Sequence, residues 1–580
     1  KEQLVIYPDS SFSRSATRQI VTLNGRWQAR KEGQQNWTDV WVPGAYDFEG
    51  MVHFKRSFLL DSSFVGHTFK LVAFGINNRC TISLNGEVVT NHEGGHTPFA
   101  VGLDGHALFF DKENEIQISV DNSRHPKESL PLQHSPQVVR NLGGIFRDLY
   151  ILAVPKITID AIHLKPVFQE NYLKGQLSVK SFIEIGAESS QDKSQLTLQM
   201  RLFDPDTQRP IAHGSENIQR ARGAIEKEMT LDVGSVKPWT PDVPKLYILE
   251  ISIFRNRQIL DEVRERIGFS EFRIQERSFF LNGQPFILKG VDWVEDYGSI
   301  GATAGWEQIE REIQLIKGLG ANIIRVIGTP PHPYFFDLCD RLGMLVFVEI
   351  PLSLVPEARF RNADFSGVAG NYFKETVAMG ANHPCTAAWG LGVDYSTEQA
   401  QTRAFLNGLR QVTQERSNRP LYLVSRFLPL SLPSSVDFGL WEFNNKSAAE
   451  LFKSIDELVV NKPVAISFGY TIARTMHPDS SDQRNAGAGE AHRQAQEIHA
   501  DKIGRVLTDA LLTEKTAGFL VHTFNDWRQT SATITSGAFD DAFLNRTGLV
   551  DLSRQKRVAY EVVKKAFTGK KVRVISQHFK

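Results

Sequence analysis

The sequence predicts a multidomain chain in which two β-sandwiches precede a (β/α)₈ barrel. The chain has 580 residues, too many for one hydrophobic core, because cores stop growing at about 250–300 residues. Up to about residue 274, short β-branched or aromatic runs alternate with turn signals. From about residue 275 onward, apolar runs alternate with helical patterns, which is typical of repeated β/α units.

The first predicted domain covers residues 1–155. Strand-like runs occupy residues 69–74, 80–84 and 115–120, and an Asn85-Gly86 pair follows the second of them. Asn-Gly favours a tight hairpin because both residues tolerate positive φ. Short strands with turns between them predict a β-sandwich.

The second predicted domain covers residues 156–274. Alternating runs occur at residues 176–179, 195–202 and 246–253. A β-rich segment of this length is the right size for an immunoglobulin-like sandwich.

The third predicted domain covers residues 275–580. Between its apolar runs lie helical patterns, such as the apolar spacing of Ile309, Ile313, Ile316 and Leu319. Eight such β/α units fit a TIM barrel, whose chemistry lies at the carboxyl ends of its strands. The apolar runs are 286–291, 322–327, 345–350, 386–391, 421–425, 436–441, 463–467 and 518–524. The strand-end residues are therefore the candidates for function: Asp292, Trp293, Gly328, Thr329, Glu349, Val393, Asp394, Arg426, Glu442, Ser467 and 522–527.

Composition excludes several classes of protein. Lys+Arg and Asp+Glu number 66 each, so no net charge attracts nucleic acid. The sequence shows no run of the ~18 apolar residues that a membrane-spanning helix needs, and no apolar leader. Three cysteines far apart predict buried thiols, and no His, Cys or Gly-rich pattern predicts a metal or another cofactor.

Several motifs in order along the chain resemble one family. They include Leu23-Asn-Gly-Arg-Trp27, Gly143-Gly-Ile-Phe-Arg147, the run from Phe280 to Gly290, and Thr547-Gly-Leu-Val-Asp551. Together they resemble glycoside hydrolase family 2, which contains β-galactosidases, β-glucuronidases and β-mannosidases. The resemblance implies that the first sandwich is a jelly roll and that the ligand is a carbohydrate.

The resemblance also implies where the two catalytic carboxylates belong. A retaining glycosidase uses one carboxyl as acid/base and another as nucleophile, about 5 Å apart. Here Asp394 stands at the acid/base Glu position, and Ser467 stands at the nucleophile Glu position. Val393 replaces an Asn, residues 328–330 replace His-Tyr-Pro, and His522 replaces a Trp. Asp is one methylene shorter than Glu, and a serine hydroxyl cannot stabilise the reacting centre as an anion does.

Each candidate residue has a second interpretation. Asp394 is either a residual general acid or a carboxylate that caps the following helix. Glu442 is either one member of a displaced acid/base pair with Asp394 or an ion-paired strand-end residue. Glu349 is interpreted as a structural support of the site. Tryptophans at strand ends could stack on a sugar ring or pack in the core. The predicted substrate-binding residues are Arg325, Trp293, Trp389, Glu349, His522, Asp526 and Trp527.

The sequence therefore favours a catalytically impaired, carbohydrate-binding relative of family 2. Two alternatives stay open: an atypical exo-β-glycosidase that uses Asp394 and Glu442, and an ectodomain or scaffold module. The resemblance places the protein in the periplasm or outside the cell. Assembly into a homo-oligomer is left open.

Overall fold

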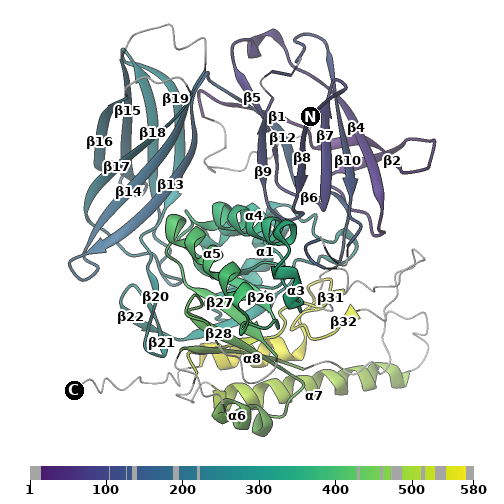
Figure 1. Ribbon diagram of the computed structural model, residues 1–580. Helices are drawn as coiled ribbons and strands as arrows, with labels where there is room; N and C mark the ends of the chain where they lie inside the picture. The colour runs from purple at the N-terminus through teal and green to yellow at the C-terminus, as the bar shows by residue number, and fades with distance from the viewer. Residues whose placement is uncertain are drawn as a thin grey trace.

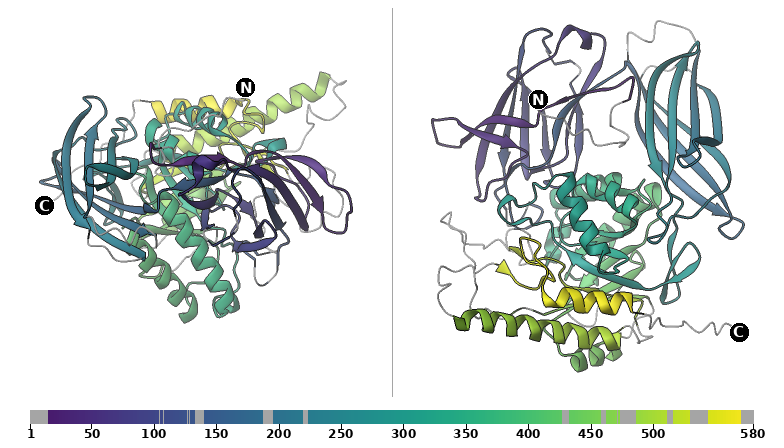
Figure 2. Two further views of the ribbon diagram at one scale, coloured as in Figure 1. Left: turned by 90° about the horizontal axis from the view of Figure 1, so that it is seen from above. Right: turned by 180° about the vertical axis from the view of Figure 1, so that it is seen from behind.

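The protein is described as a computed structural model. It covers residues 15–103, 105–106, 108–125, 127, 129–132, 140–186, 195–218, 223–426, 432–457, 462–470, 472, 486–510, 516–528 and 544–569. Two β-rich units lie side by side on one face of a barrel, and the long helix α7 (Ala486–Ala510) lies at the opposite side of that barrel (Figure 1). Views from above and from behind show the same arrangement (Figure 2).

The first unit is a sandwich of a four-stranded sheet in the order β1-β12-β5-β9 and a six-stranded sheet in the order β3-β2-β4-β10-β7-β8. A two-stranded ribbon pairs β6 with β11, and a 3₁₀ helix, η1, covers Ser62–Phe64. The strands are β1 (Gln19–Thr22), β2 (Gly25–Lys31), β3 (Thr38–Val42), β4 (Met51–Leu59), β5 (Thr68–Ala73), β6 (Ile76–Asn77), β7 (Arg79–Leu84), β8 (Glu87–Glu93), β9 (Phe99–Gly102), β10 (Glu113–Asp121), β11 (Gly144–Ile145) and β12 (Leu149–Val154).

The second unit is a smaller sandwich. One sheet has the order β13-β14-β17 and the other the order β16-β15-β18-β19. The strands are β13 (Ile157–Gln169), β14 (Lys174–Ile185), β15 (Leu196–Asp204), β16 (Arg209–Ile218), β17 (Gly223–Ser235), β18 (Tyr247–Arg255) and β19 (Gln258–Ile267). All neighbouring strands are antiparallel, as short connections between successive strands require.

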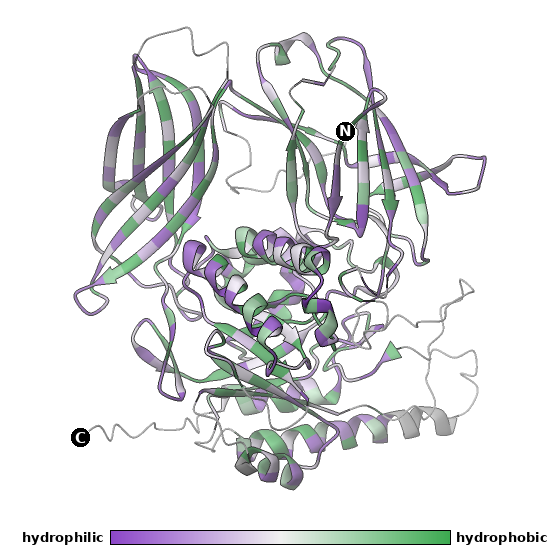
Figure 3. Ribbon diagram, viewed as in Figure 1, coloured by the Kyte–Doolittle hydropathy of each residue, from purple (hydrophilic) through white to green (hydrophobic). Residues whose placement is uncertain are grey.

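Alternation of side chains explains why these segments form strands. In β10, Ile116, Ile118 and Val120 are buried, while the residues between them face outward. A strand places successive side chains on opposite faces, so such a segment buries one face against the second sheet. The same alternation appears as bands of apolar and polar colour along both sandwiches (Figure 3).

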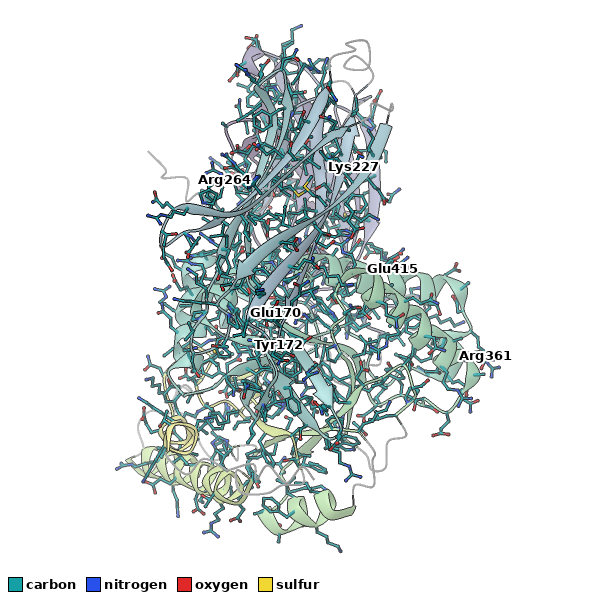
Figure 4. The ribbon with its side chains drawn as sticks, turned by 90° about the vertical axis from the view of Figure 1, so that its left-hand side faces the viewer. Glu170, Tyr172, Lys227, Arg264, Arg361 and Glu415 are labelled. Atoms are coloured by element: carbon teal, nitrogen blue, oxygen red, sulfur yellow. The ribbon has the colours of Figure 1, made fainter. Side chains whose placement is uncertain are left out.

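A three-stranded sheet, β20 (Phe272–Gln275), β21 (Ser278–Leu281) and β22 (Gln284–Phe286), leads from the second sandwich into the barrel. The turn after β13 packs on it: the Tyr172 hydroxyl donates a hydrogen bond to Glu271, and the Tyr172 ring lies against Gly283, where a Cβ would meet it at 2.3 Å. Figure 4 shows Glu170 and Tyr172 at this end of the sandwich, near the barrel. The contact fixes the sandwich to the barrel entry.

The barrel is closed and has eight parallel strands, as the sequence predicted. Most residues of these strands are buried, because one face packs inside the barrel and the other packs under helices. The strands are β23 (Leu288–Trp293), β24 (Ile323–Val326), β25 (Leu345–Glu349), β26 (Thr386–Val393), β27 (Leu421–Ser425), β28 (Phe438–Asn444), β29 (Val464–Gly469) and β30 (Gly518–Val521).

Helices cover the outside of the barrel. In α1, Ile309, Ile313 and Ile316 are fully buried, which confirms the stripe predicted from their spacing. The remaining elements are η3 (Gly298–Ile300), α1 (Trp306–Lys317), α2 (Pro333–Leu342), α3 (Glu357–Phe360), α4 (Ala363–Gly380), α5 (Ala400–Arg416), α6 (Ala448–Glu457), α8 (Val558–Thr568), and the paired strands β31 (Trp527–Arg528) and β32 (Leu544–Asn545). Among the described residues, no helix is long and apolar enough to cross a membrane.

Candidate functional site: a buried arginine at the mouth of the barrel

One arginine organises the carboxyl ends of the barrel strands. Arg325 on β24 lies beside Asp292 on β23, and the register pairs these two residues directly. Its guanidinium donates hydrogen bonds to Asp292 Oδ2 at 3.0 Å, Glu349 Oε1 at 2.5 Å and Glu442 Oε1 at 2.7 Å. All four side chains are at most 1% exposed. The N–H groups of Arg325 thus donate to three carboxylates of the protein itself.

Asp292 is the second centre of this cluster. Its Oδ2 atom also accepts a hydrogen bond from Ser467 Oγ at 2.5 Å and lies 2.9 Å from His522 Nδ1. Ser467 comes from β29, where the register pairs it with Glu442 of β28. Ser467, which the family resemblance assigns to the nucleophile position, therefore donates a hydrogen bond to a neighbouring carboxylate.

Burial and ion pairing shift the pKa values of this cluster in opposite directions, because burial disfavours the charged forms and ion pairing favours them. Burial favours the neutral forms, but Arg325 together with His522 and Ser467 holds the pKa of Asp292 below its usual value. The three carboxylates raise the pKa of Arg325 well above its ordinary value in spite of its burial. Burial raises the pKa of Glu349, although Arg325 counteracts this effect. The environment thus favours a proton on Glu349 more than on Asp292.

The cluster leaves one oxygen of each carboxylate without a hydrogen-bond partner among the described residues. These atoms are Asp292 Oδ1, Glu349 Oε2 and Glu442 Oε2, all buried. Tyr422 donates to the other oxygen of Glu349 at 3.0 Å. Buried unpaired oxygens are costly, so each of them is a place where an ordered water would bind.

Asp292, Glu442 and His522 could in principle hold a metal ion, since one ligand atom from each lies within 4.8 Å of the others. However, the Arg325 guanidinium already contacts both carboxylates. A divalent cation at the same place would be repelled by this fixed positive charge. The donor set therefore fits an arginine better than it fits a metal ion.

Asp394 lies at the end of β26 and has a different partner. Its carboxylate forms an ion pair with Arg426 and accepts a hydrogen bond from the Arg426 backbone N–H at 2.8 Å. The side chain is 2% exposed, and the residue adopts a positive φ of 51°. In the described part of the chain no hydrogen bond or ion pair joins Asp394 to Glu442. Asp394 pairs with Arg426, whereas Glu442 shares Arg325 with Asp292 and Glu349.

The predicted sugar-stacking tryptophans lie in the interior. Trp293 stacks on Phe335 with ring centroids 4.7 Å apart and donates to Glu312 at 2.8 Å. Trp389 is fully buried and donates to Ser417 at 3.1 Å. Both indoles thus pack in the core of the barrel and satisfy their N–H groups there.

Trp527 and Asp526 lie after β30. Trp527 is 5% exposed and packs with Val294 and Ile327 in a small apolar cluster at the barrel mouth. Asp526 forms a two-pronged ion pair with Arg557, at 2.6 and 2.5 Å, next to helix α8. Asp526 therefore anchors the last helix.

A narrow cavity lies over β24, β25 and β26. Its free volume is about 30 Å³, which is room for roughly two water molecules. Loops of the first sandwich contribute Asn78, Arg124 and Asn141, and the barrel contributes Thr329 and Glu349. Sequence reasoning did not identify the residues from the first sandwich, because nothing in a local pattern shows which loop will reach a barrel more than 150 residues away.

Asn78 is the best-placed donor in this cavity. It is 3% exposed, and no side-chain hydrogen bond of Asn78 is formed within the described ranges. Arg124 contacts Glu49 through Nε at 2.8 Å. The cavity can therefore accept a small polar group, such as a hydroxyl or a carboxylate.

Fold and site together define a three-domain protein with the architecture of a barrel glycosidase. Residues 157–269 match the family model "Glycosyl hydrolases family 2", and residues 272–424 match "Glycosyl hydrolases family 2, TIM barrel domain". These two stretches of the chain are thus similar to the sandwich and barrel domains of that family.

Curated relatives support the same family. A β-galactosidase of Thermoanaerobacter pseudethanolicus is 25% identical over 61% of this chain and 46% of its own length. A β-glucuronidase of Bacteroides fragilis is 22% identical over 66% of this chain and 57% of its own length. The chain spans about half the length of these relatives.

Solved structures share the complete fold. The β-D-glucuronidase of Dictyoglomus thermophilum superposes with a TM-score of 0.80 at 22% identity, covering 96% of this chain and 98% of that one. The β-galacturonidase of Eisenbergiella tayi, bound to galacturonate, gives a TM-score of 0.78 at 21% identity, covering 95% and 97%. These similarities show the fold.

Proposed function

We propose that this protein is a non-hydrolysing, carbohydrate-binding relative of the family 2 glycosidases. The observation that carries the proposal is the contact of Ser467 with Asp292 inside the Arg325 cluster. A retaining mechanism needs a carboxylate that can attack the sugar. Here the corresponding position is a hydroxyl that donates to a buried carboxylate.

The atypical exo-β-glycosidase is less well supported. It would need Asp394 and Glu442 to face one sugar, but each is buried and paired with its own arginine. Removing either carboxylate from its arginine would leave a buried charge unpaired, at a cost of several kcal/mol. Substrate binding would therefore have to overcome that cost before any chemistry.

Carbohydrate is proposed as the ligand on two grounds. Relatives of this chain carry names of enzymes that act on β-glucuronides and β-galactosides, and one similar structure holds galacturonate. The cavity with Asn78, Arg124 and Glu349 offers donors and acceptors for one hydroxyl or carboxylate of a sugar. We propose that a terminal sugar group enters there while the ring stays outside.

Hydrolysis of aryl β-glycosides tests the first half of the proposal. The panel comprises the glucuronide, galacturonide, galactoside, mannoside and glucoside, with Asp394→Ala and Glu442→Ala variants and Glu415→Ala as an exposed control (Figure 4 labels Glu415). We expect no turnover above the uncatalysed rate in any protein. Turnover that both variants abolish and the control retains would establish the displaced carboxylate pair instead.

Calorimetric titration with glucuronate, galacturonate and their methyl β-glycosides tests the second half. We expect saturable binding that Asn78→Ala weakens about tenfold, which corresponds to the loss of one good hydrogen bond. Asn371→Ala, at an exposed site on α4, is the control and should change nothing. Absence of binding to every sugar would leave the scaffold interpretation.

Location in the periplasm or outside the cell and assembly into a homo-oligomer are proposals as well. Fractionation of the source cells tests the first, and light scattering at several protein concentrations tests the second.

A further inference from the structure

A cavity with an apolar wall lies away from the barrel mouth, where the three parts of the molecule meet. Its free volume is about 360 Å³, compared with about 30 Å³ at the mouth. Strands β5, β9 and β12 contribute from the first sandwich, β13 from the second, and helices α2 and α4 and the end of α5 from the barrel. Small-molecule sites occur preferentially at such domain interfaces and usually measure about 300–1,000 Å³.

One wall of this junction cavity is apolar. Val72, Leu152 and Val154 lie on the outer face of the four-stranded sheet, where they form a separate buried cluster, and Phe74 packs against it. Met379 of α4 also lines the cavity. Apolar residues on the outer face of a sheet are normally buried by another element. Here helix α4 does not bury them completely, because the cavity lies beside them.

Most charged groups in the lining already have partners. Arg18 pairs with Asp261 at 2.6 Å, Lys70 pairs with Asp160, and His383 pairs with Asp340 at 2.6 Å. Glu375 accepts from Thr97 at 2.5 Å and also contacts His92. These pairs hold the three parts of the molecule together and are not available to a ligand.

Arg416 is the exception. It is the last residue of α5, it lines the junction cavity, and within the described chain no carboxylate pairs with it. Its Nε atom is buried without an acceptor. Burial lowers the pKa of Arg416, and no neighbouring acid counteracts this effect. A partly buried guanidinium with an unpaired Nε atom costs stability, and an anionic ligand would relieve that cost.

Asp337 of α2 contributes a carboxyl group to the lining of the same cavity. Burial raises its pKa to about 6, and the described residues form no hydrogen bond with its carboxyl group. Its charge is therefore partly suppressed near neutral pH, so it repels an incoming anion less than an ordinary aspartate does.

We propose that the junction cavity binds a small amphiphilic carboxylate, whose apolar body lies against Phe74, Val72 and Met379 and whose carboxylate pairs with Arg416. The shape and the charge both support this class of ligand: an apolar wall covers the body, and one unpaired guanidinium receives the head group. The proposal is independent of the function proposed for the barrel mouth, because the two cavities share no lining residue.

The probe for this site is 2-naphthoate, and its uncharged analogue 2-naphthamide is the matched control. Binding to the full chain is measured by titration calorimetry and by saturation-transfer NMR. We expect saturable, one-to-one binding of the naphthoate and about tenfold weaker binding of the amide, as expected for the loss of one charge-assisted contact.

Three variants localise the binding. Arg416→Gln should weaken naphthoate binding about tenfold and remove the preference over the amide, whereas Arg403→Gln, exposed on the same helix, should change neither. Met379→Trp should abolish binding by filling the cavity. Because that variant could fold poorly, its unfolding midpoint is measured in parallel, and Arg416→Gln carries the test if the midpoint collapses.

The opposite results would overturn the proposal. They are no saturable binding to the unmodified chain at millimolar probe, equal affinity for acid and amide, or equal losses in Arg416→Gln and Arg403→Gln. Asn78→Ala should leave naphthoate binding intact, which separates failure of this proposal from failure of the function proposed for the barrel mouth.

Discussion

The barrel mouth and the junction cavity differ in how their charges are satisfied. At the mouth, Arg325 is shared by three carboxylates, and about 30 Å³ of free volume remains nearby. At the junction, no carboxylate among the described residues forms an ion pair with Arg416, and about 360 Å³ of free volume remains. At the strand ends, the charged side chains thus pair with one another. Between the domains, an arginine without an ion pair in the described part of the chain lines a cavity large enough for a ligand.

The largest expected effect comes from removing the centre of the mouth cluster. Arg325→Met would leave Asp292, Glu349 and Glu442 buried without their shared cation, and we expect a loss of about 3–5 kcal/mol in the free energy of unfolding. Unfolding in urea, monitored by tryptophan fluorescence, measures this loss of free energy. Arg403→Met, at an exposed position, is the control and should stay within about 0.5 kcal/mol. Similar losses of unfolding free energy in Arg325→Met and Arg403→Met would contradict the view that Arg325 stabilises the three carboxylates at the mouth.

A pH-dependent effect of similar size is expected next to the junction. Burial lowers the pKa of His383, but the ion pair with Asp340 outweighs burial and raises the pKa to about 9. Because the folded value lies above the unfolded value of about 6.5, protonation stabilises the fold by about 3 kcal/mol below pH 6.5. This contribution is lost as the pH rises to about 9.

The unfolding midpoint in urea, recorded at pH 6.5 and at pH 9, measures this loss. His383→Gln should reduce the difference between the two midpoints substantially. The charge of Asp337 changes at lower pH, around 6, and should not interfere. An unchanged difference in the variant would show that His383 is not the group responsible.

A smaller effect is expected at Ser467, whose hydroxyl donates a hydrogen bond to Asp292. Ser467→Ala removes one of the donors to Asp292 but leaves Arg325 and His522 in place. We expect a loss of about 1 kcal/mol in the free energy of unfolding. Ser553→Ala, in an exposed turn, is the matched control and should be neutral. A loss above about 3 kcal/mol would mean that the hydroxyl holds the cluster together.

Much of the fold followed from local patterns. Period-two alternation in β10 and the apolar spacing of Ile309, Ile313 and Ile316 in α1 predicted a strand and a helix, and both are present. The eight apolar runs correspond to the eight strands of the closed barrel. Such patterns can be recognised in a sequence because burial of one face requires apolar residues at a fixed spacing, two residues in a strand and about 3.6 in a helix.

The site was predictable only in part. The order of barrel strands placed Glu349, Glu442, Ser467 and His522 at one edge, and the resemblance added Arg325. The structure joins the two glutamates to Arg325, and it joins Arg325, Ser467 and His522 to Asp292. The same argument placed Asp394 with Glu442, but the structure pairs Asp394 with Arg426. Strand order determines which residues reach the mouth, whereas side-chain direction and pairing depend on contacts between strands that sequence spacing does not contain.

By itself, the sequence predicted the succession of two sandwiches and a barrel, and its motifs predicted a family resemblance in which Ser467 stands at the position of a carboxylate. Only the tertiary structure showed that Trp293 and Trp389 pack inside, that loops of the first sandwich line the mouth, and that no carboxylate among the described residues pairs with Arg416. The physical reason is range: periodicity and turn chemistry act between near neighbours in the chain, while cavities and buried ion pairs arise where distant segments meet.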